Sequence, residues 1–258
     1  MQTATQPQQE ETELNAELNT LEGKLKTLCD REYQFNTQPR ETISINVCFT
    51  EESFKQLSKY RIEIALYNIA INFNRQFDVA VDYKLRIMPS KLPTINKHIY
   101  QETYGDKNLE TISAQEKQEL DKKYKEEVRN ITLLTSKFTA SQKLFCKYQL
   151  MLSEDSQFNQ ELYVIFQPIP NERKKNKTVG HAVIGKNICF VDPSENYMTT
   201  DSLINTTLHE LGHCLGIKRH SILYNKIMCA KDVERCKSNK WTYLQKRKIR
   251  KGLEKYIH

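Results

Sequence analysis

The twelve residues from 209 to 220, HELGHCLGIKRH, constrain this chain more than any other part of its sequence. They hold three of the six histidines in 258 residues. His209 and His213 are four positions apart, so on a helix their imidazoles lie on one face, about one turn from each other. Gly216 is suited to end that helix, because glycine adopts the left-handed conformation of a C′ residue without strain. The chain can then turn back and bring His220 to the same point.

Three imidazoles at this spacing predict a zinc site. Zinc binds histidine nitrogen at about 2.0–2.1 Å, and three protein ligands leave the fourth position to water, as in catalytic sites. Glu210 follows the first histidine but points about 100° round the helix, so it is predicted to act as a general base and not as a ligand. Two alternatives stay open: the histidines belong to an ordinary polar loop or core, or the zinc serves structure alone.

The composition of the chain indicates its cellular compartment and the redox state of its cysteines. No stretch approaches the roughly 20 apolar residues that cross a bilayer, and the N-terminus has neither a basic start nor an apolar run. We therefore expect an intracellular protein, or one exported by a route that needs no N-terminal signal. The seven cysteines are an odd number with no paired framework, which favours reduced thiols.

The net charge of +7 comes partly from the basic tail at 237–256. A solvated helix face is the favoured interpretation, and an acidic partner is the alternative. We do not expect nucleic acid to be a partner, since Trp241 is the one aromatic residue of the tail that looks free to stack on a base.

The first 40 residues are predicted to be a polar N-terminal segment with a short helix. Five leucines at spacings of 4, 3, 4 and 3 form its apolar stripe: Leu14, Leu18, Leu21, Leu25 and Leu28. Packing on the main domain is the favoured interpretation, and a pro-segment or a self-association element are alternatives. Residues 41–258 are predicted to form the main domain, with an insertion at about 89–160.

The main domain is predicted to begin strand–helix–strand, which implies a partly parallel sheet. The two strands are 42–49 and 78–88, and Thr50 caps a helix between them whose apolar face runs from Phe54 through Leu57 to Phe73. Three more short strands are expected at 161–169, 179–184 and 187–192. The helix with the histidines starts near 199–202, and a basic helix spans 240–256.

HELGHCLGIKRH resembles the HExxHxxGxxH zinc motif of the metzincin metallopeptidases. Met228 lies eight residues after His220, which is similar to the spacing of the Met-turn in matrixins. The segment DSLINTTLHELGHCLGI also looks like the active-site helix of bacterial and viral matrixin-like peptidases. The close match covers about 180–230. The resemblance implies an α+β fold: a twisted mixed sheet with long helices, the active-site helix and a small C-terminal lobe.

By this resemblance the chain would be a zinc endopeptidase acting on protein or peptide substrates. His209, His213 and His220 would be the zinc ligands, Glu210 the general base and Met228 the Met-turn residue. The substrate would lie along an antiparallel edge strand made of Val179, Gly180, His181, Ala182 and Val183. The alternatives are a non-catalytic, zinc-stabilised protein whose basic C-terminal helix binds an acidic partner, and an enzyme that cleaves a non-peptide amide.

Some positions depart from related families. Astacins and serralysins have a tyrosine where Ala230 stands, and archaemetzincins have a cysteine where Ser221 stands. Cys229 and Cys236 are candidates for a second metal site, with buried or free thiols as the alternative.

Two further expectations come from the same resemblance. Asp192 and Glu195 occupy positions where matrixins can hold calcium, although acids in a turn are commonly turn residues. Cys29 and Asp30 are candidates for a zinc-blocking group of a pro-segment, but the motif that usually surrounds such a group is missing.

Overall fold

The computed structural model describes residues 6–35, 39, 41–88, 100, 103–105, 112–135, 140–153, 156–169, 179–193, 199–220, 227–228 and 240–257. The chain divides into two compact units. The first comprises Met1–Ser90, Asn159–Ile169 and Asn176–His258, and it contains the sheet and the histidine motif. The second comprises Lys91–Phe158 and Pro170–Lys175, and it includes the helices α5 (Ala114–Thr135) and α6 (Ala140–Leu152). A short 3-10 helix, η1, spans Phe158–Gln160.

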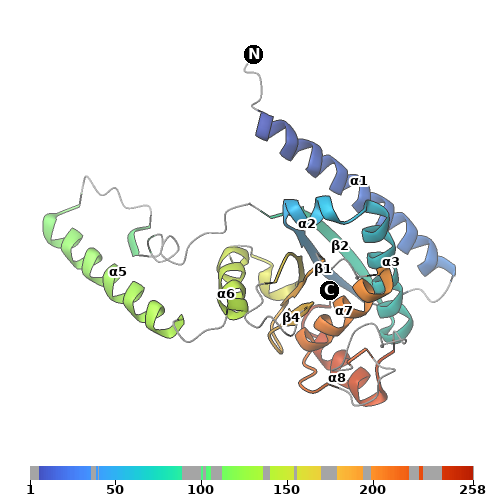
Figure 1. Ribbon diagram of the computed structural model, residues 1–258. Helices are drawn as coiled ribbons and strands as arrows, with labels where there is room; N and C mark the ends of the chain where they lie inside the picture. Colours follow the sequence, from blue (N-terminus) through green and yellow to red (C-terminus); the bar gives the residue numbers. More distant parts are fainter. Residues whose placement is uncertain are drawn as a thin grey trace. The chain divides into compact units, whose positions relative to one another are not determined.

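The first unit is built on a mixed five-stranded sheet with strand order β2-β1-β3-β5-β4. Figure 1 labels β1, β2 and β4 of this sheet. β1 pairs in parallel with β2 and with β3, β3 pairs in parallel with β5, and β4 pairs antiparallel with β5 at the edge. The strands are β1 (Glu41–Phe49), β2 (Val79–Ile87), β3 (Leu162–Phe166), β4 (Gly180–Ala182) and β5 (Ile188–Val191). The α+β class with a mixed sheet is therefore confirmed, as is the parallel strand–helix–strand unit at its start.

The crossover between β1 and β2 contains two helices where one was predicted. Thr50 caps α2 (Glu51–Gln56) as expected, its side chain accepting a hydrogen bond from the Ser53 N–H. The helix ends at Gln56, and the backbone of the next residue, Leu57, is extended. Ser58 caps α3 (Lys59–Phe77) by accepting from the Arg61 N–H, so a second helix starts there. The apolar residues keep a helical spacing across the break between α2 and α3, so the sequence pattern does not reveal the break.

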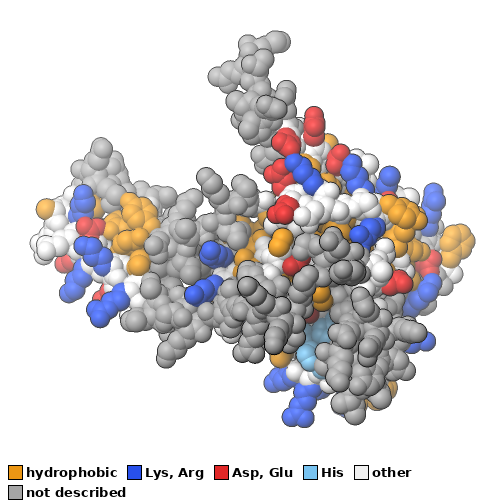
Figure 2. All heavy atoms as spheres, in the orientation of Figure 1, with side chains coloured by type: hydrophobic (Ala, Val, Ile, Leu, Met, Phe, Trp, Pro, Cys, Tyr) orange, Lys and Arg blue, Asp and Glu red, His pale blue; other side chains and the backbone are white. Residues whose placement is uncertain are grey.

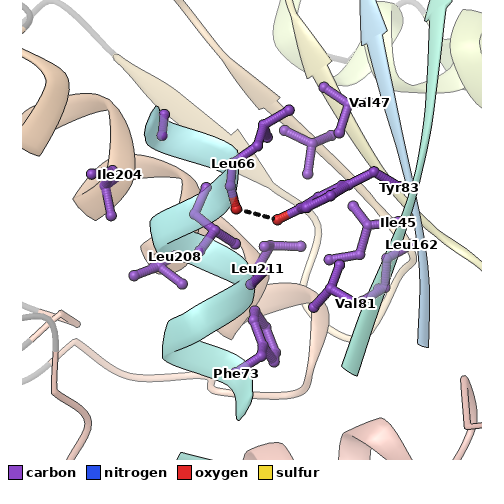
Figure 3. Packing of buried hydrophobic residues seen from close by; sticks show 14 of the residues in the cluster. Ile45, Val47, Leu66, Phe73, Val81, Tyr83, Leu162, Ile204, Leu208 and Leu211 are labelled. Atoms are coloured by element: carbon purple, nitrogen blue, oxygen red, sulfur yellow. Dashed lines mark hydrogen bonds between the residues drawn. The ribbon is translucent and has the colours of Figure 1, made fainter. Parts of the chain in front are cut away.

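The hydrophobic core lies between one face of the sheet and the helices α3 and α7 (Thr200–Cys214). Figure 3 shows Leu66 and Phe73 of α3 beside Leu208 and Leu211 of α7, with Val81 and other strand residues opposite them. Inside this core the Tyr83 hydroxyl has a hydrogen-bond partner, because it donates to the Leu66 carbonyl at 2.8 Å. This packing holds α7 against the sheet and so determines where its histidines lie.

The helix α1 (Gln6–Phe35) covers the outer edge of β2, at the end of the sheet opposite β4. Its leucine stripe is the buried face, joining the core at Leu18, Leu21 and Leu25. Two side chains of α1 accept hydrogen bonds from the β2 backbone: the Tyr33 hydroxyl from Val81 and the Glu22 carboxylate from Leu85. Unpaired strand edges promote aggregation, so α1 protects this edge.

Replacing Tyr33 by phenylalanine tests this role of α1. The variant is expected to lower the free energy of unfolding by about 1–3 kcal/mol, because the Val81 N–H loses its partner while buried. Urea denaturation measures the change. Tyr60→Phe is the matched control, since Tyr60 is 70% exposed and should change stability little. Equal stability of the two variants would contradict the edge-protecting role.

Two sequence expectations concern residues that the structure places in this core. The prediction that Trp241 is free to stack on a base is wrong. Its side chain is 3% exposed and packs against Phe73 and Phe77. Trp241 precedes the basic helix α8 (Tyr243–Leu253), so its buried side chain anchors the start of that helix.

Cys29 is also buried, on the inner face of α1, where its thiol is hydrogen-bonded to Tyr33 and burial raises the pKa of the thiol to about 11. A protonated core thiol is not available as a zinc-blocking group in this conformation.

Within the part of the chain that the structure describes, every helix is too short or too polar to cross a membrane.

Candidate metal centre

The helix α7 carries the first two histidines of the motif. It begins at Thr200, where the Thr199 side chain caps it by accepting from the Ser202 N–H. It ends at Cys214, and Gly216 follows with a φ of 95°, the left-handed conformation expected at that position. The reversed chain forms hydrogen bonds back to the last turn, from the Ile217 N–H to the Gly212 carbonyl at 3.0 Å. This turn delivers His220 to the histidines of α7.

The three imidazoles form an almost equilateral triangle. The ring centroids are 4.9 Å apart for His209 and His213, and 5.0 Å for each of the other two pairs. One ligand atom of each lies within 4.8 Å of the others, and the Nε2 atoms of His213 and His220 are 3.1 Å apart. Tetrahedral zinc with bonds of about 2.0–2.1 Å places its nitrogens about 3.3 Å from one another, so the arrangement fits zinc. Histidine side chains reach the surface in the view of Figure 2.

Two backbone carbonyls set the protonation of the helical histidines. His209 Nδ1 donates to the Ile227 carbonyl at 2.8 Å, and His213 Nδ1 donates to the Ile217 carbonyl at 2.6 Å. A carbonyl can only accept, so Nδ1 carries the hydrogen and the Nε2 of a neutral ring keeps its lone pair. This is the outer-shell pattern that orients metal-binding histidines. Neither carbonyl could be identified from the sequence, since nothing in the residue types marks it.

Met228 lies beneath the helix, fully buried. A Cβ added to Gly212 would come 2.7 Å from the Met228 sulfur, so the glycine leaves the space that the methionine fills. Gly212 stands between Glu210 and His213 in the motif, and its function in packing was not predicted. The contact explains why the turn containing Ile227 sits close enough to orient His209.

Glu210 is also buried, with 7% of its surface exposed. It lies on the side of α7 that faces β4, where its carboxylate approaches the backbone of Gly180. Burial raises the pKa of its carboxyl group to about 8 in the metal-free protein. Burial acts in the opposite direction on the imidazoles: it lowers the pKa of His209 to about 4 and also lowers the pKa of His213. His209 and His213 are therefore neutral at physiological pH, as metal binding requires.

These pKa values predict how the stability of the metal-free protein depends on pH. The folded pKa of Glu210, about 8, exceeds its ordinary value of 4.5, so the stabilisation of its neutral form is lost as pH rises towards 8. His209 acts in the opposite direction, but only below 6.5, because its pKa is lowered. Between pH 6.5 and 8 the free energy of unfolding should therefore fall by about 2 kcal/mol.

Denaturation in the presence of a chelator measures this dependence. Glu210→Gln stays neutral at every pH, so its stability should remain flat over the same interval. Parallel curves for the wild type and Glu210→Gln would show that Glu210 does not titrate in this range.

The predicted edge strand is β4, at the end of the sheet next to α7. Gly180 pairs with Val191, and the Asp192 N–H donates to the Val179 carbonyl at 2.9 Å. His181 lies in this strand, near enough to His213 to contribute to the lowering of its pKa. The Nε2 atom of His181 is buried and meets no hydrogen-bond partner among the described residues.

The remaining candidates do not join this cluster. The Asp192 carboxylate accepts a hydrogen bond from the Ile169 N–H at 2.8 Å, which is a structural use, and calcium has no support among the described residues. The other positions lie outside the described residues: Glu195, Ser221, Cys229, Ala230 and Cys236.

No protein-family model matches this chain, and no curated protein matches its sequence. Among solved structures, archaemetzincin from Methanopyrus kandleri is 11% identical with a TM-score of 0.49; the match covers 83% of this chain and 96% of that one. Archaemetzincin from Archaeoglobus fulgidus, complexed with malonate, is 13% identical with a TM-score of 0.40, covering 80% and 99%. Metalloproteinase-II from Bacteroides fragilis is 12% identical with a TM-score of 0.45, covering 84% and 54%. Likenesses of this size establish no activity, so function has to be inferred from the chain's own residues.

Proposed function

We propose that this chain is a zinc-dependent endopeptidase, a matrixin-like member of the metzincin clan. The observation that carries the proposal is the triangle of His209, His213 and His220, with the Nδ1 atoms of the first two donating to carbonyls. In this arrangement the Nε2 lone pairs of the helical histidines are free for one ion. No fourth histidine, cysteine or carboxylate joins the cluster among the described residues, which favours an open, catalytic site.

Zinc bound by these histidines would supply Lewis acidity towards the scissile carbonyl. Glu210 would take a proton from the attacking water on its carboxylate and pass it to the leaving amine. Its burial suits this task, because a carboxylate that is poorly hydrated is a stronger base than an exposed one. Its place beside β4 would set the proton transfer next to the strand on which the substrate lies.

The edge strand would bind an extended peptide through its main chain. Because Val179 and Asp192 form a hydrogen-bonded pair, the antiparallel pattern turns the main-chain groups of Val179 and His181 towards β5. Those of Gly180 and Ala182 then point outwards, where a peptide can add as a further strand. Recognition of this kind reads the backbone of the substrate, which is consistent with an endopeptidase.

A test needs the full chain, purified and loaded with zinc. One zinc ion per chain by elemental analysis, together with cleavage of a denatured protein mixture that a chelator abolishes, is the expected result. Mass spectrometry of the new termini would then define the preferred cleavage sites. Full zinc occupancy with no cleavage would instead favour the non-catalytic alternative, in which zinc stabilises the fold and α8 binds an acidic partner.

A further inference from the structure

Gly180 of the edge strand β4 packs directly against α7, the helix that carries Glu210. A Cβ at this position would lie 2.6 Å from Glu210 Oε1 and 2.8 Å from Glu210 Cγ. It would also lie 2.8 Å from Thr206 Cγ2. Glu210 and Thr206 are four residues apart and so present their side chains on one face of α7. Residue 180 therefore lies between the side chains of Glu210 and Thr206, where there is no room for a methyl group.

The reason for glycine here is space and not backbone conformation. Among the described glycines, positive φ angles occur at Gly105, Gly185 and Gly216, and Gly180 is not one of them. Alanine at position 180 would adopt the same backbone without strain. Any effect of the substitution then reports on the contact with Glu210 and Thr206.

Thr206 limits how the contact can relax. It is 2% exposed and belongs to the middle of α7, whose position is held by the core. An added methyl overlaps both Cγ and the carboxylate of Glu210, so relief of the overlap requires the Glu210 side chain, carboxylate included, to move away from position 180. A small displacement matters for a proton-transfer group, because a misplacement of about 1 Å can cost on the order of 10²-fold in rate.

We propose that Gly180 is a positioning residue, whose missing side chain lets the Glu210 carboxylate rest against the main chain of the substrate-binding strand. This inference rests on the proposed function and adds to it the residue that places the base. Gly180 then has two functions. Its outward main-chain groups bind the peptide, and its lack of a side chain makes room for the Glu210 carboxylate, which acts on the scissile bond of that peptide.

Gly180→Ala is the direct test, and Gly23→Ala is the matched control, since a Cβ at Gly23 meets nothing within 4 Å. We expect Gly180→Ala to keep one zinc ion per chain and a similar KM, and to lose roughly 10- to 100-fold in kcat. Gly23→Ala should retain the kcat of the wild type. An unchanged kcat for Gly180→Ala would overturn the inference and leave the proposed function standing.

A second readout does not depend on activity. Crystal structures of the zinc-loaded wild type and Gly180→Ala should show the Glu210 carboxylate moved by about 1 Å or more, with the three histidines unmoved. A carboxylate in the same place in both would overturn the inference even if the wild type proved inactive. If Gly180→Ala does not fold, Gly180→Ala combined with Thr206→Ser removes one of the three contacts, and the same two outcomes decide.

Discussion

Glu210→Gln is expected to lower kcat by roughly 10²- to 10⁴-fold while the protein keeps one zinc ion per chain, the loss typical for removing a general base. Glutamine preserves the shape of the side chain that lies against Gly180 but cannot accept the proton. Zinc should stay, because the histidines and the carbonyls that orient two of them are untouched. Steady-state kinetics and elemental analysis of the same preparation measure the two quantities.

Asp201→Asn is the control for this variant. It makes the same change of charge in the first turn of α7, where Asp201 is exposed and lies about two helical turns before His209. Its kcat should stay close to that of the wild type. If Glu210→Gln retained the full rate on a peptide substrate, Glu210 would have no part in the mechanism, whatever the zinc content.

His213→Ala is expected to remove the metal and with it all measurable activity. The loss of an outer-shell partner alone costs about 10- to 100-fold in metal affinity, and the loss of one of three direct ligands should exceed this. His213 also bridges the site, with Nδ1 donating to Ile217 and Nε2 3.1 Å from that of His220. Zinc content after dialysis, together with a competition titration against a chromogenic chelator, measures the affinity.

Arg219→Ala is the control for the ligand variant, because Arg219 is the exposed neighbour of His220 in the same turn. It should retain stoichiometric zinc. Stoichiometric zinc in His213→Ala, with an affinity within tenfold of the wild type, would show that the three histidines do not share an ion.

Much of the chain could be predicted from local patterns. The alternation of residues 42–49 and 78–88 predicted two strands, which pair in parallel as β1 and β2. Thr50 was recognised as a cap, and Gly216 as the residue that ends the motif helix. Each of these features depends on residues within one or two turns of one another, so the residue types and their spacing carry the necessary information.

Contacts between distant segments could not be predicted in this way. The split between α2 and α3 was missed because Leu57 fits the apolar periodicity although its backbone is extended. Trp241 was misplaced because its surroundings in sequence are basic, while its neighbours in space are Phe73 and Phe77. The use of Tyr33 to satisfy the β2 backbone joins residues 48 positions apart.

The sequence by itself determined the chemistry of the candidate centre: which three imidazoles can converge, which carboxylate stands beside them, and where the helix must turn. Spacing along a helix and the conformational freedom of one glycine suffice for that, since both are local properties. Only the tertiary structure decided how these groups are held. The Ile227 and Ile217 carbonyls orient two imidazoles, Met228 fills the space that Gly212 leaves, and Gly180 brings the edge strand against Glu210. With the exception of Ile217, these partners come from segments remote in sequence, and packing of the core alone brings them to α7.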